Sequence, residues 1–146
     1  MNDVTPLPAT TTFRLGALGS IVTARFTERI GALGLKPKDV GLLTLLHDDG
    51  PVSQLEAARG MGVAPSLMVT VADRLEALGA LRRLRDPGDR RRQHLVLTEQ
   101  GRALLARCAT TAQELDAELT AGLDERDRAA LNHALGRLAA ANGLPH

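Results

Sequence analysis

Residues 81–97, LRRLRDPGDRRRQHLVL, decide the fold, because the hydrophobic pattern changes here from a helical to an extended period. Two strands are predicted, Leu81 to Arg85 and Arg92 to Leu97, joined by the turn Asp86-Pro87-Gly88-Asp89. Arg82 to Arg92 holds six arginines against two aspartates, a local excess of +4 in a chain of formal net charge +1. The remainder sums to about −3. A basic projection on a weakly acidic body is typical of a protein that contacts a polyanion at a defined place.

Upstream of this hairpin, the chain reads as four helices separated by turns. Apolar residues recur every three or four positions over 10–34, which predicts one helix of about six turns. Pro37 suits the first turn of a second helix. Ser53 and Glu56 form a capping box that opens a short third helix. Pro65 again fits the first position of a fourth helix, which ends at a glycine.

Downstream of the hairpin, two further helices are expected. Thr98 should cap a long helix of about 25 residues, and Asp124 should cap a last one. Each of these two helices carries a single apolar stripe, and so does the first helix of the chain. The second to fourth helices and the hairpin form a winged helix-turn-helix, which does not need the three outer helices in order to fold. Their stripes require a partner, which favours a two-fold dimer built through both chain ends.

The expected organisation is mainly α-helical with a small β-hairpin wing. A flexible arm over residues 1–9 precedes a single domain over 10–146. Within it lies a winged helix-turn-helix at about 36–98, flanked by dimerisation helices at about 10–34 and 99–144.

The composition restricts the class of function. With 146 residues, 44% of them hydrophobic and 24% charged, the chain is an ordinary globular one, and its apolar runs are too short to span a membrane. Aromatic residues make up 1%, from Phe13 and Phe26 alone, which argues against base-stacking platforms. The N-terminus has neither the basic nor the apolar region of a secretory signal, so a cytoplasmic location is expected.

Four short motifs resemble one known family. Asp86-Pro87-Gly88-Asp89-Arg90-Arg91 and Leu97-Thr98-Glu99-Gln100-Gly101 resemble the wing and post-wing signature of MarR-type transcription regulators. Gly62-Val63-Ala64-Pro65-Ser66 and Asp73-Arg74-Leu75-Glu76-Ala77-Leu78-Gly79 resemble the same family's recognition helix and its exit. The resemblance covers roughly Leu35 to Leu105 in motif detail, and the order and spacing of the motifs make it specific.

The resemblance implies a homodimeric, sequence-specific DNA-binding regulator, most often a repressor. One helix of each subunit would enter the major groove and each wing the adjacent minor groove, on a pseudo-palindrome with half-sites about 10 bp apart. A small amphipathic or phenolic effector would bind between the DNA-binding lobe and the dimer helices and release the DNA. The DNA-binding residues that the resemblance implies are Ser53, Pro65, Ser66, Leu67, Thr70, Arg74, Asp89, Arg90, Arg91 and Arg92.

The resemblance also implies a role for each part of the reading helix. Ser66 and Thr70 would bond base edges or phosphate, Leu67 would meet a thymine methyl, and Arg74 would hold phosphate. The chain departs from the family at Ala64, where a hydroxyl residue is usual, and in the apolar run after Ser66. Direct base readout is therefore expected to be thin and readout of DNA shape by the wing correspondingly larger.

In the wing, Asp89 is expected to brace the turn, and an arginine at the tip to enter a narrow, A·T-rich minor groove. Which of Arg90, Arg91 and Arg92 does so stays open. The arginines of the first strand, Arg82, Arg83 and Arg85, are interpreted as solvated.

Other chemistry is not expected. Cys108, the only cysteine, lies on an apolar helix stripe and is interpreted as a packing residue. The four histidines are scattered over different elements, so no metal site is predicted, and no catalytic grouping or cofactor motif appears. The alternative function is a winged-helix module for protein–protein contact without specific DNA binding, which has no need of so basic a hairpin.

Overall fold

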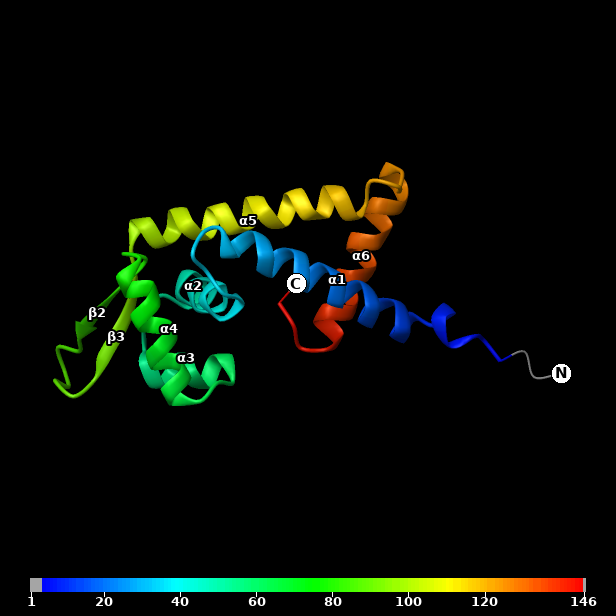
Figure 1. Cartoon of the computed structure of the whole chain (residues 1–146). Helices are drawn as coiled ribbons and strands as arrows, with labels where there is room; N and C mark the ends of the chain where they lie inside the picture. Colours follow the sequence, from blue (N-terminus) through cyan, green and yellow to red (C-terminus); the bar gives the residue numbers. More distant parts are fainter. Residues whose placement is uncertain (1–3, 146) are drawn as a thin grey trace. The chain divides into compact units, whose positions relative to one another are not determined.

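The computed structural model describes residues 4–145, and the chain divides into two compact units between Ala112 and Gln113. Figure 1 shows the order of the elements along the chain. The first unit contains the helix-turn-helix and the sheet. The second begins inside the long helix α5 and continues through α6.

The first unit opens with a helix that follows a short turn. A single 3-10 turn, η1 (Leu7–Ala9), lies in the segment expected to be a loose arm, whose first three residues fall outside the described part of the chain. The helix α1 (Thr11–Gly31) begins where the Thr10 hydroxyl accepts a hydrogen bond from the N–H of Phe13. The predicted first helix is confirmed.

Three shorter helices build the body of the first unit. They are α2 (Pro37–Asp49), α3 (Gln54–Met61) and α4 (Pro65–Ala77), and each begins where the sequence predicts. The capping box before α3 is confirmed: the Ser53 hydroxyl accepts from the N–H of Glu56, whose carboxylate accepts from the N–H of Ser53. These two bonds satisfy polar groups that the start of a helix leaves without intrahelical partners.

The sheet has three strands, one more than the predicted hairpin. The hairpin strands β2 (Leu81–Arg85) and β3 (Gln93–Leu97) pair antiparallel, with Arg83 opposite Leu95. A two-residue strand, β1 (Val52–Ser53), pairs with the other side of β3, so the order is β1-β3-β2. So short a strand has no periodicity of its own, which is why the sequence pattern did not reveal it.

A single hydrophobic core holds these elements of the first unit together. Its most buried large side chains come from α1, α2, α4 and the two long strands, and Cys108 of α5 closes it. They include Ile30, Leu42, Leu43, Met68, Leu75, Leu81 and Leu95. The face of α4 that carries Met68 and Leu75 is therefore fixed inward, and its opposite face is left for solvent or a ligand.

The end of β3 is joined to the end of α4 by one threonine. The hydroxyl of Thr98 donates to the carbonyl of Gly79 at 2.6 Å and accepts from the N–H of Gly101 at 3.0 Å, and its own N–H donates to the carbonyl of Ala80. Gly79 has a φ of +70°, a conformation that glycine adopts without strain. The post-wing motif is thus a structural joint that also starts the helix α5 (Glu99–Leu119).

The second unit consists of the last part of α5 and the helix α6 (Glu125–Ala141). The helix α5 has 21 residues, shorter than the expected 25 or so, because the chain turns after Leu119. Asp124 caps α6 as predicted, its carboxylate accepting from the N–H of Asp127. No helix in residues 4–145 is long and apolar enough to cross a membrane.

The helices outside the winged helix expose large apolar side chains. In the first unit these lie on α1 and include Phe13, Leu15, Leu18 and Ile21. In the second unit they include Leu119, Leu131, Leu135 and Leu138. A soluble single domain rarely leaves so many large apolar groups open to water in continuous stripes.

Candidate nucleic-acid interface

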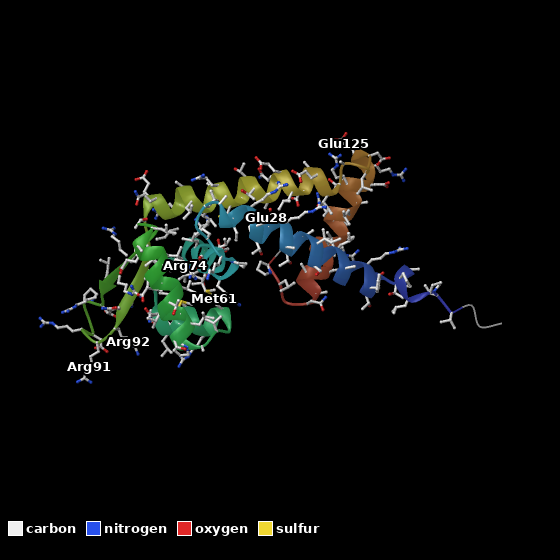
Figure 2. All side chains as sticks on the ribbon, viewed as in Figure 1. Glu28, Met61, Arg74, Arg91, Arg92 and Glu125 are labelled. Carbon is white, nitrogen blue, oxygen red and sulfur yellow. The ribbon has the colours of Figure 1, made fainter. Side chains whose placement is uncertain are left out.

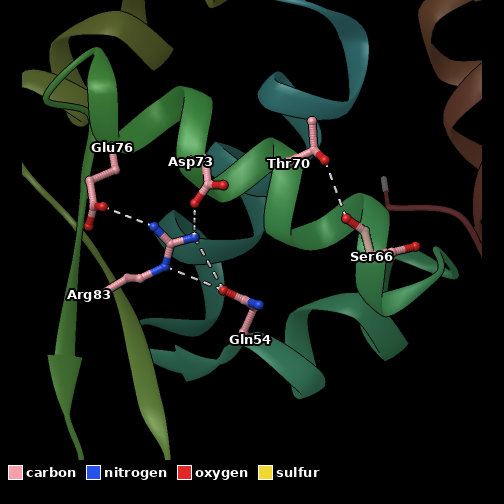
Figure 3. A network of polar contacts seen from close by, with 6 residues as sticks. All are labelled: Gln54, Ser66, Thr70, Asp73, Glu76 and Arg83. Atoms are coloured by element: carbon pink, nitrogen blue, oxygen red, sulfur yellow. Dashed lines mark hydrogen bonds and ion pairs between the residues drawn. The ribbon is translucent and has the colours of Figure 1, made fainter.

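The exposed face of α4 presents small hydroxyl and apolar side chains. Ser66, Leu67, Val69 and Thr70 are all exposed, whereas Met68 between them is buried. The Thr70 hydroxyl donates to the backbone carbonyl of Ser66 at 3.3 Å, as Figure 3 shows. With one hydroxyl turned toward its own helix, this face offers few polar groups for reading base edges.

The start of α4 carries no side-chain cap. Ala64 occupies the N-cap position without a side-chain hydrogen bond, and the exposed Pro65 follows at the first helical position. Proline loses nothing there, because that position has no intrahelical partner for an N–H.

Arg74, which the resemblance assigns to phosphate, is paired with a carboxylate inside the fold. Its Nε donates to both carboxylate oxygens of Asp39 on α2, at 3.0 and 2.9 Å, and Nη2 donates to Oδ1 at 2.9 Å. The Asp39 side chain is 0% exposed and that of Arg74 27%. Asp39 Oδ2 also accepts from the backbone N–H of Lys36 at 2.7 Å. These bonds pair α4 with α2, and Figure 2 labels Arg74. The expected contact of Arg74 with phosphate stays a prediction.

Arg83 corrects a second interpretation, because it is not a solvated bystander. Its Nη2 donates to Asp73 Oδ1 at 2.6 Å and its Nη1 to Glu76 Oε1 at 2.9 Å, both on α4. Gln54 Oε1, on α3, accepts from Nε and Nη2 at 3.4 Å. Figure 3 shows this guanidinium between the three partner side chains, and only 15% of the Arg83 side chain is exposed.

These contacts do two things for the surface. They tie β2 of the wing to α4 and α3 through one planar, five-donor group. They also neutralise two carboxylates that would otherwise repel a polyanion approaching α4. The signal for this role was present in the sequence: Arg83 has the same strand parity as the buried Leu81, and Asp73 and Glu76 are three residues apart on a helix.

The turn of the wing is braced by two aspartates. Asp86 Oδ1 accepts from the N–H of Gly88 at 2.8 Å, and Asp89 Oδ1 accepts from the N–H of Arg91 at 3.0 Å. The expectation that Asp89 braces the turn is confirmed. Its second carboxylate oxygen lies 3.9 Å from Arg92 Nε, a loose pairing of two exposed groups.

The arginines at the end of the wing are exposed. Arg90, Arg91 and Arg92 all lie open to solvent, and Figure 2 shows Arg91 and Arg92 at the end of the hairpin. With a fixed turn behind them, they form a compact positive charge at the far end of the wing, while α4 presents its exposed face beside the same sheet.

Ser53 has a structural use. It is buried, and both its hydroxyl and its N–H take part in the capping box of α3. The backbone N–H of Ser53, and then its hydroxyl, lower the pKa of the Glu56 carboxyl. The sequence analysis placed Ser53 among the DNA-contacting residues, which stays a prediction; within the fold its polar groups hold the start of α3.

The free cysteine lies in the hydrophobic core and not at this interface. Cys108 is buried, and this burial raises the pKa of its thiol, consistent with a packing role. No cluster of three potential metal ligands occurs among residues 4–145.

Comparison with known proteins identifies the family to which this fold belongs. The family model described as MarR family matches residues 35–92, from the start of the helix-turn-helix to the wing. The HTH-type transcriptional repressor Rv2887 of Mycobacterium tuberculosis is 30% identical over 111 residues, which cover 76% of this chain and 80% of that repressor. Three other curated relatives, 31% to 37% identical, are matched over 42%, 61% and 63% of their own length, so the chain spans about half the length of these relatives.

Solved structures agree with these relatives. The YusO protein from Bacillus subtilis is similar with a TM-score of 0.77 and 27% identity, over 89% of this chain and 92% of that one. CouR from Rhodococcus jostii RHA1, solved with bound p-coumaroyl-CoA, is similar with a TM-score of 0.68 and 26% identity, over 92% and 95%. The winged helix-turn-helix, the family match and the repressor relative agree, and the chain belongs to the MarR family.

Proposed function

We propose that the protein is a sequence-specific DNA-binding transcriptional regulator, acting as a repressor. The observation that carries the proposal is the exposed face of α4. It lies beside a braced wing with three exposed arginines at its end. On the duplex, α4 enters the major groove and the wing follows the adjacent minor groove. The similarity to a protein named as a transcriptional repressor supports the same function. Its place of action is then the cytoplasm, and it carries out no catalysis.

The chemistry of α4 suggests how the operator is read. Leu67, with 40% of its surface exposed, offers an apolar contact to a thymine methyl, while Ser66 and Thr70 reach base edges or phosphate. With so few polar groups on α4, minor-groove shape carries much of the specificity, because a narrow groove concentrates negative potential that attracts guanidinium groups.

Replacing Arg91 with alanine should weaken binding of a duplex selected from a random pool by about 1–3 kcal/mol. The reason is the loss of an exposed guanidinium at the braced end of the wing. No ion pair within residues 4–145 involves this side chain, so its removal disturbs no internal contact of that kind. Fluorescence anisotropy at about 0.15 M salt measures it. Arg107→Ala, which removes the same charge from an exposed position on α5, is the control and should bind like the wild type. An unchanged titration for Arg91→Ala would exclude the minor-groove role.

Salt dependence separates this function from the alternative of a protein–protein module. A DNA-binding wing releases counterions, so log K should fall with log salt by about 0.9 for each phosphate neutralised. A flat response, or no binding to any duplex in low salt, would favour the protein-contact alternative.

We propose that a second copy of the chain covers the apolar faces of the outer helices. Support comes from the exposed leucines and aromatic side chain on α1, and separately from the exposed leucines of α5 and α6. A two-fold dimer buries both sets and matches the two-fold symmetry of a pseudo-palindrome, with half-sites about 10 bp apart.

Replacing Leu119 with glutamate should raise the dimer dissociation constant at least tenfold, about 1.4 kcal/mol. The side chain is 40% exposed in the single chain, and a carboxylate buried there against apolar groups would lack a partner. Ala117→Glu is the matched control, because two positions along α5 turn the new charge about 200° away. Sedimentation velocity reads both. A wild type that sediments as a monomer at micromolar concentration yet binds a palindrome tightly would refute the dimer.

A small-molecule effector completes the proposal. CouR, similar over most of the chain, was solved with p-coumaroyl-CoA, which supports a phenolic or other amphipathic ligand here. Such a ligand must bind the DNA-free form more tightly in order to release the operator. Titration of the protein–operator complex with phenolic acids and their coenzyme A thioesters measures this release, and an affinity unchanged by every such compound would count against it.

A further inference from the structure

A cleft of about 510 Å³ lies in the first unit between α3, the start of α4 and the wing. Five arginines line it, Arg59 of α3 together with Arg85, Arg90, Arg91 and Arg92 of the wing, against the single carboxylate of Glu56. Two of these, Arg59 and Arg85, were not among the residues that the sequence analysis assigned to DNA.

The charge of the cleft is available to an outside ligand. Among residues 4–145, no ion pair within 4.0 Å joins Arg59 or Arg85 to a carboxylate, in contrast to Arg74 and Arg83. The Glu56 carboxylate accepts from the N–H of Ser53 at 2.9 Å and so is held against the start of α3. Several guanidinium groups around one hollow favour an anion, and their planar forks fit phosphate oxygens.

The position of the cleft indicates which anion it fits. Pro65, at the start of α4, lines one side, and the wing arginines line another. On a B-form duplex, one sugar-phosphate strand separates a major groove from the adjacent minor groove. A protein with α4 in the first groove and its wing in the second must hold that strand between them.

We propose that this cleft seats the sugar-phosphate strand between the two grooves, with Arg59 and Arg85 binding its phosphates. The inference rests on the proposed function and adds two residues and a location to it. Such contacts fix the register of the protein on the duplex and are independent of base sequence.

The strand β2 supplies a matched control for Arg85. Side chains alternate between the faces of a strand, so Leu81, Arg83 and Arg85 share one face and Arg82 lies on the other. Leu81 is buried, Arg83 contacts α4, and Arg85 lines the cleft, whereas the exposed Arg82 lines a separate hollow beside Thr98 and Glu99. Arg82→Ala therefore removes one positive charge from the same strand while leaving the cleft intact.

The first experiment compares Arg59→Ala, Arg85→Ala and Arg82→Ala on a selected operator and on a random duplex between 0.05 and 0.2 M salt. Each cleft variant should weaken both duplexes by the same factor. The ratio of the wild-type to the variant association constant should fall about 3.5-fold between 0.05 and 0.2 M salt for each phosphate that the variant no longer neutralises. This factor follows from a slope of log K against log salt of about 0.9 per phosphate. Arg82→Ala should follow the wild-type curve, and thermal unfolding checks that all three variants fold.

The second experiment locates the phosphates that the cleft binds. Neutral methylphosphonate linkages are placed one at a time along the operator. At linkages between the two grooves, each replacement should weaken DNA binding by the wild type. In Arg85→Ala one of these replacements should no longer change the affinity, and in Arg59→Ala a different one should no longer change it. Variants that lose affinity with no position silenced, or that lose it on the operator alone, would overturn the assignment.

The remaining outcomes separate this inference from its foundation. A wild type that binds no duplex refutes the proposed function itself. A wild type that binds, with both cleft variants behaving like Arg82→Ala, refutes only the cleft. Inorganic phosphate, titrated at constant ionic strength, should not compete in a saturable manner with DNA. Saturable competition that disappears in Arg85→Ala would make the cleft a site for a small anion instead of the DNA backbone.

Discussion

Replacing Arg74 with alanine should lower the free energy of unfolding by about 3 kcal/mol. The substitution leaves the carboxylate of Asp39, which is 0% exposed, without the three hydrogen bonds that the guanidinium supplies. Breaking a buried pair by removing one partner costs far more than an exposed pair is worth, because the remaining charge stays desolvated. Urea unfolding followed by circular dichroism measures the loss.

Two variants control for this result. Arg107→Ala removes an exposed arginine and should change stability by less than about 0.5 kcal/mol. Arg74→Lys keeps the charge but loses the two-pronged geometry, so its loss should be intermediate. If Arg74→Ala instead unfolds like the wild type and loses only DNA affinity, the guanidinium binds phosphate and its pairing with Asp39 adds little to stability.

Replacing Gly101 with alanine should destabilise the protein by about 3 kcal/mol, at the upper end of the usual effect of overpacking. An added Cβ would overlap the backbone carbonyl oxygen of Ala80 and would lie 2.6 Å from a methyl group of Leu97. The hydrogen bonds of Thr98 hold the backbone of Gly79 and Ala80 in place, so moving the Ala80 carbonyl away from the new Cβ would break them. Because that joint connects the exit of α4 to the wing, duplex binding should fall as well.

The matched control is Gly16→Ala in α1. Nothing lies within 4 Å of a Cβ added there, and the position is inside a helix. Alanine should therefore raise stability by up to about 1 kcal/mol, as glycine is a poor helix former. Equal thermal unfolding of Gly101→Ala and the wild type would show that the crowding against Ala80 is relaxed in solution.

The order of the elements could be predicted from the sequence because its signals are local. Helix periodicity, the capping box at Ser53, the caps at Thr98 and Asp124, and the hairpin turn each involve residues a few positions apart. In each case the local preference and the final fold agree. The strand β1 escaped because it is defined only by its pairing with β3, more than forty residues away.

The internal contacts of Arg74 and Arg83 show what such reasoning does not reach. Arg74 pairs with a residue 35 positions away, and Arg83 joins three elements. A guanidinium has no periodic signature, and sequence alone does not say whether its partner is a carboxylate of the same chain or a phosphate of another molecule. The wing-tip arginines differ because, among residues 4–145, no ion pair joins them to another element of the fold.

The Arg83 contacts also bear on how operator preference evolves in such a protein. Because this one side chain fastens the wing to α4, the spacing between these two elements belongs to the scaffold. Ser66, Leu67 and Thr70 of α4 and the arginines at the wing tip are exposed and make no contact with Arg83, so they can change without disturbing that scaffold. After gene duplication, a few surface substitutions can give one copy a preference for a new DNA sequence, while the spacing between α4 and the wing stays the same. A substitution at Arg83, Asp73 or Glu76 would loosen this spacing. These three residues should therefore be retained while the recognised DNA sequence changes.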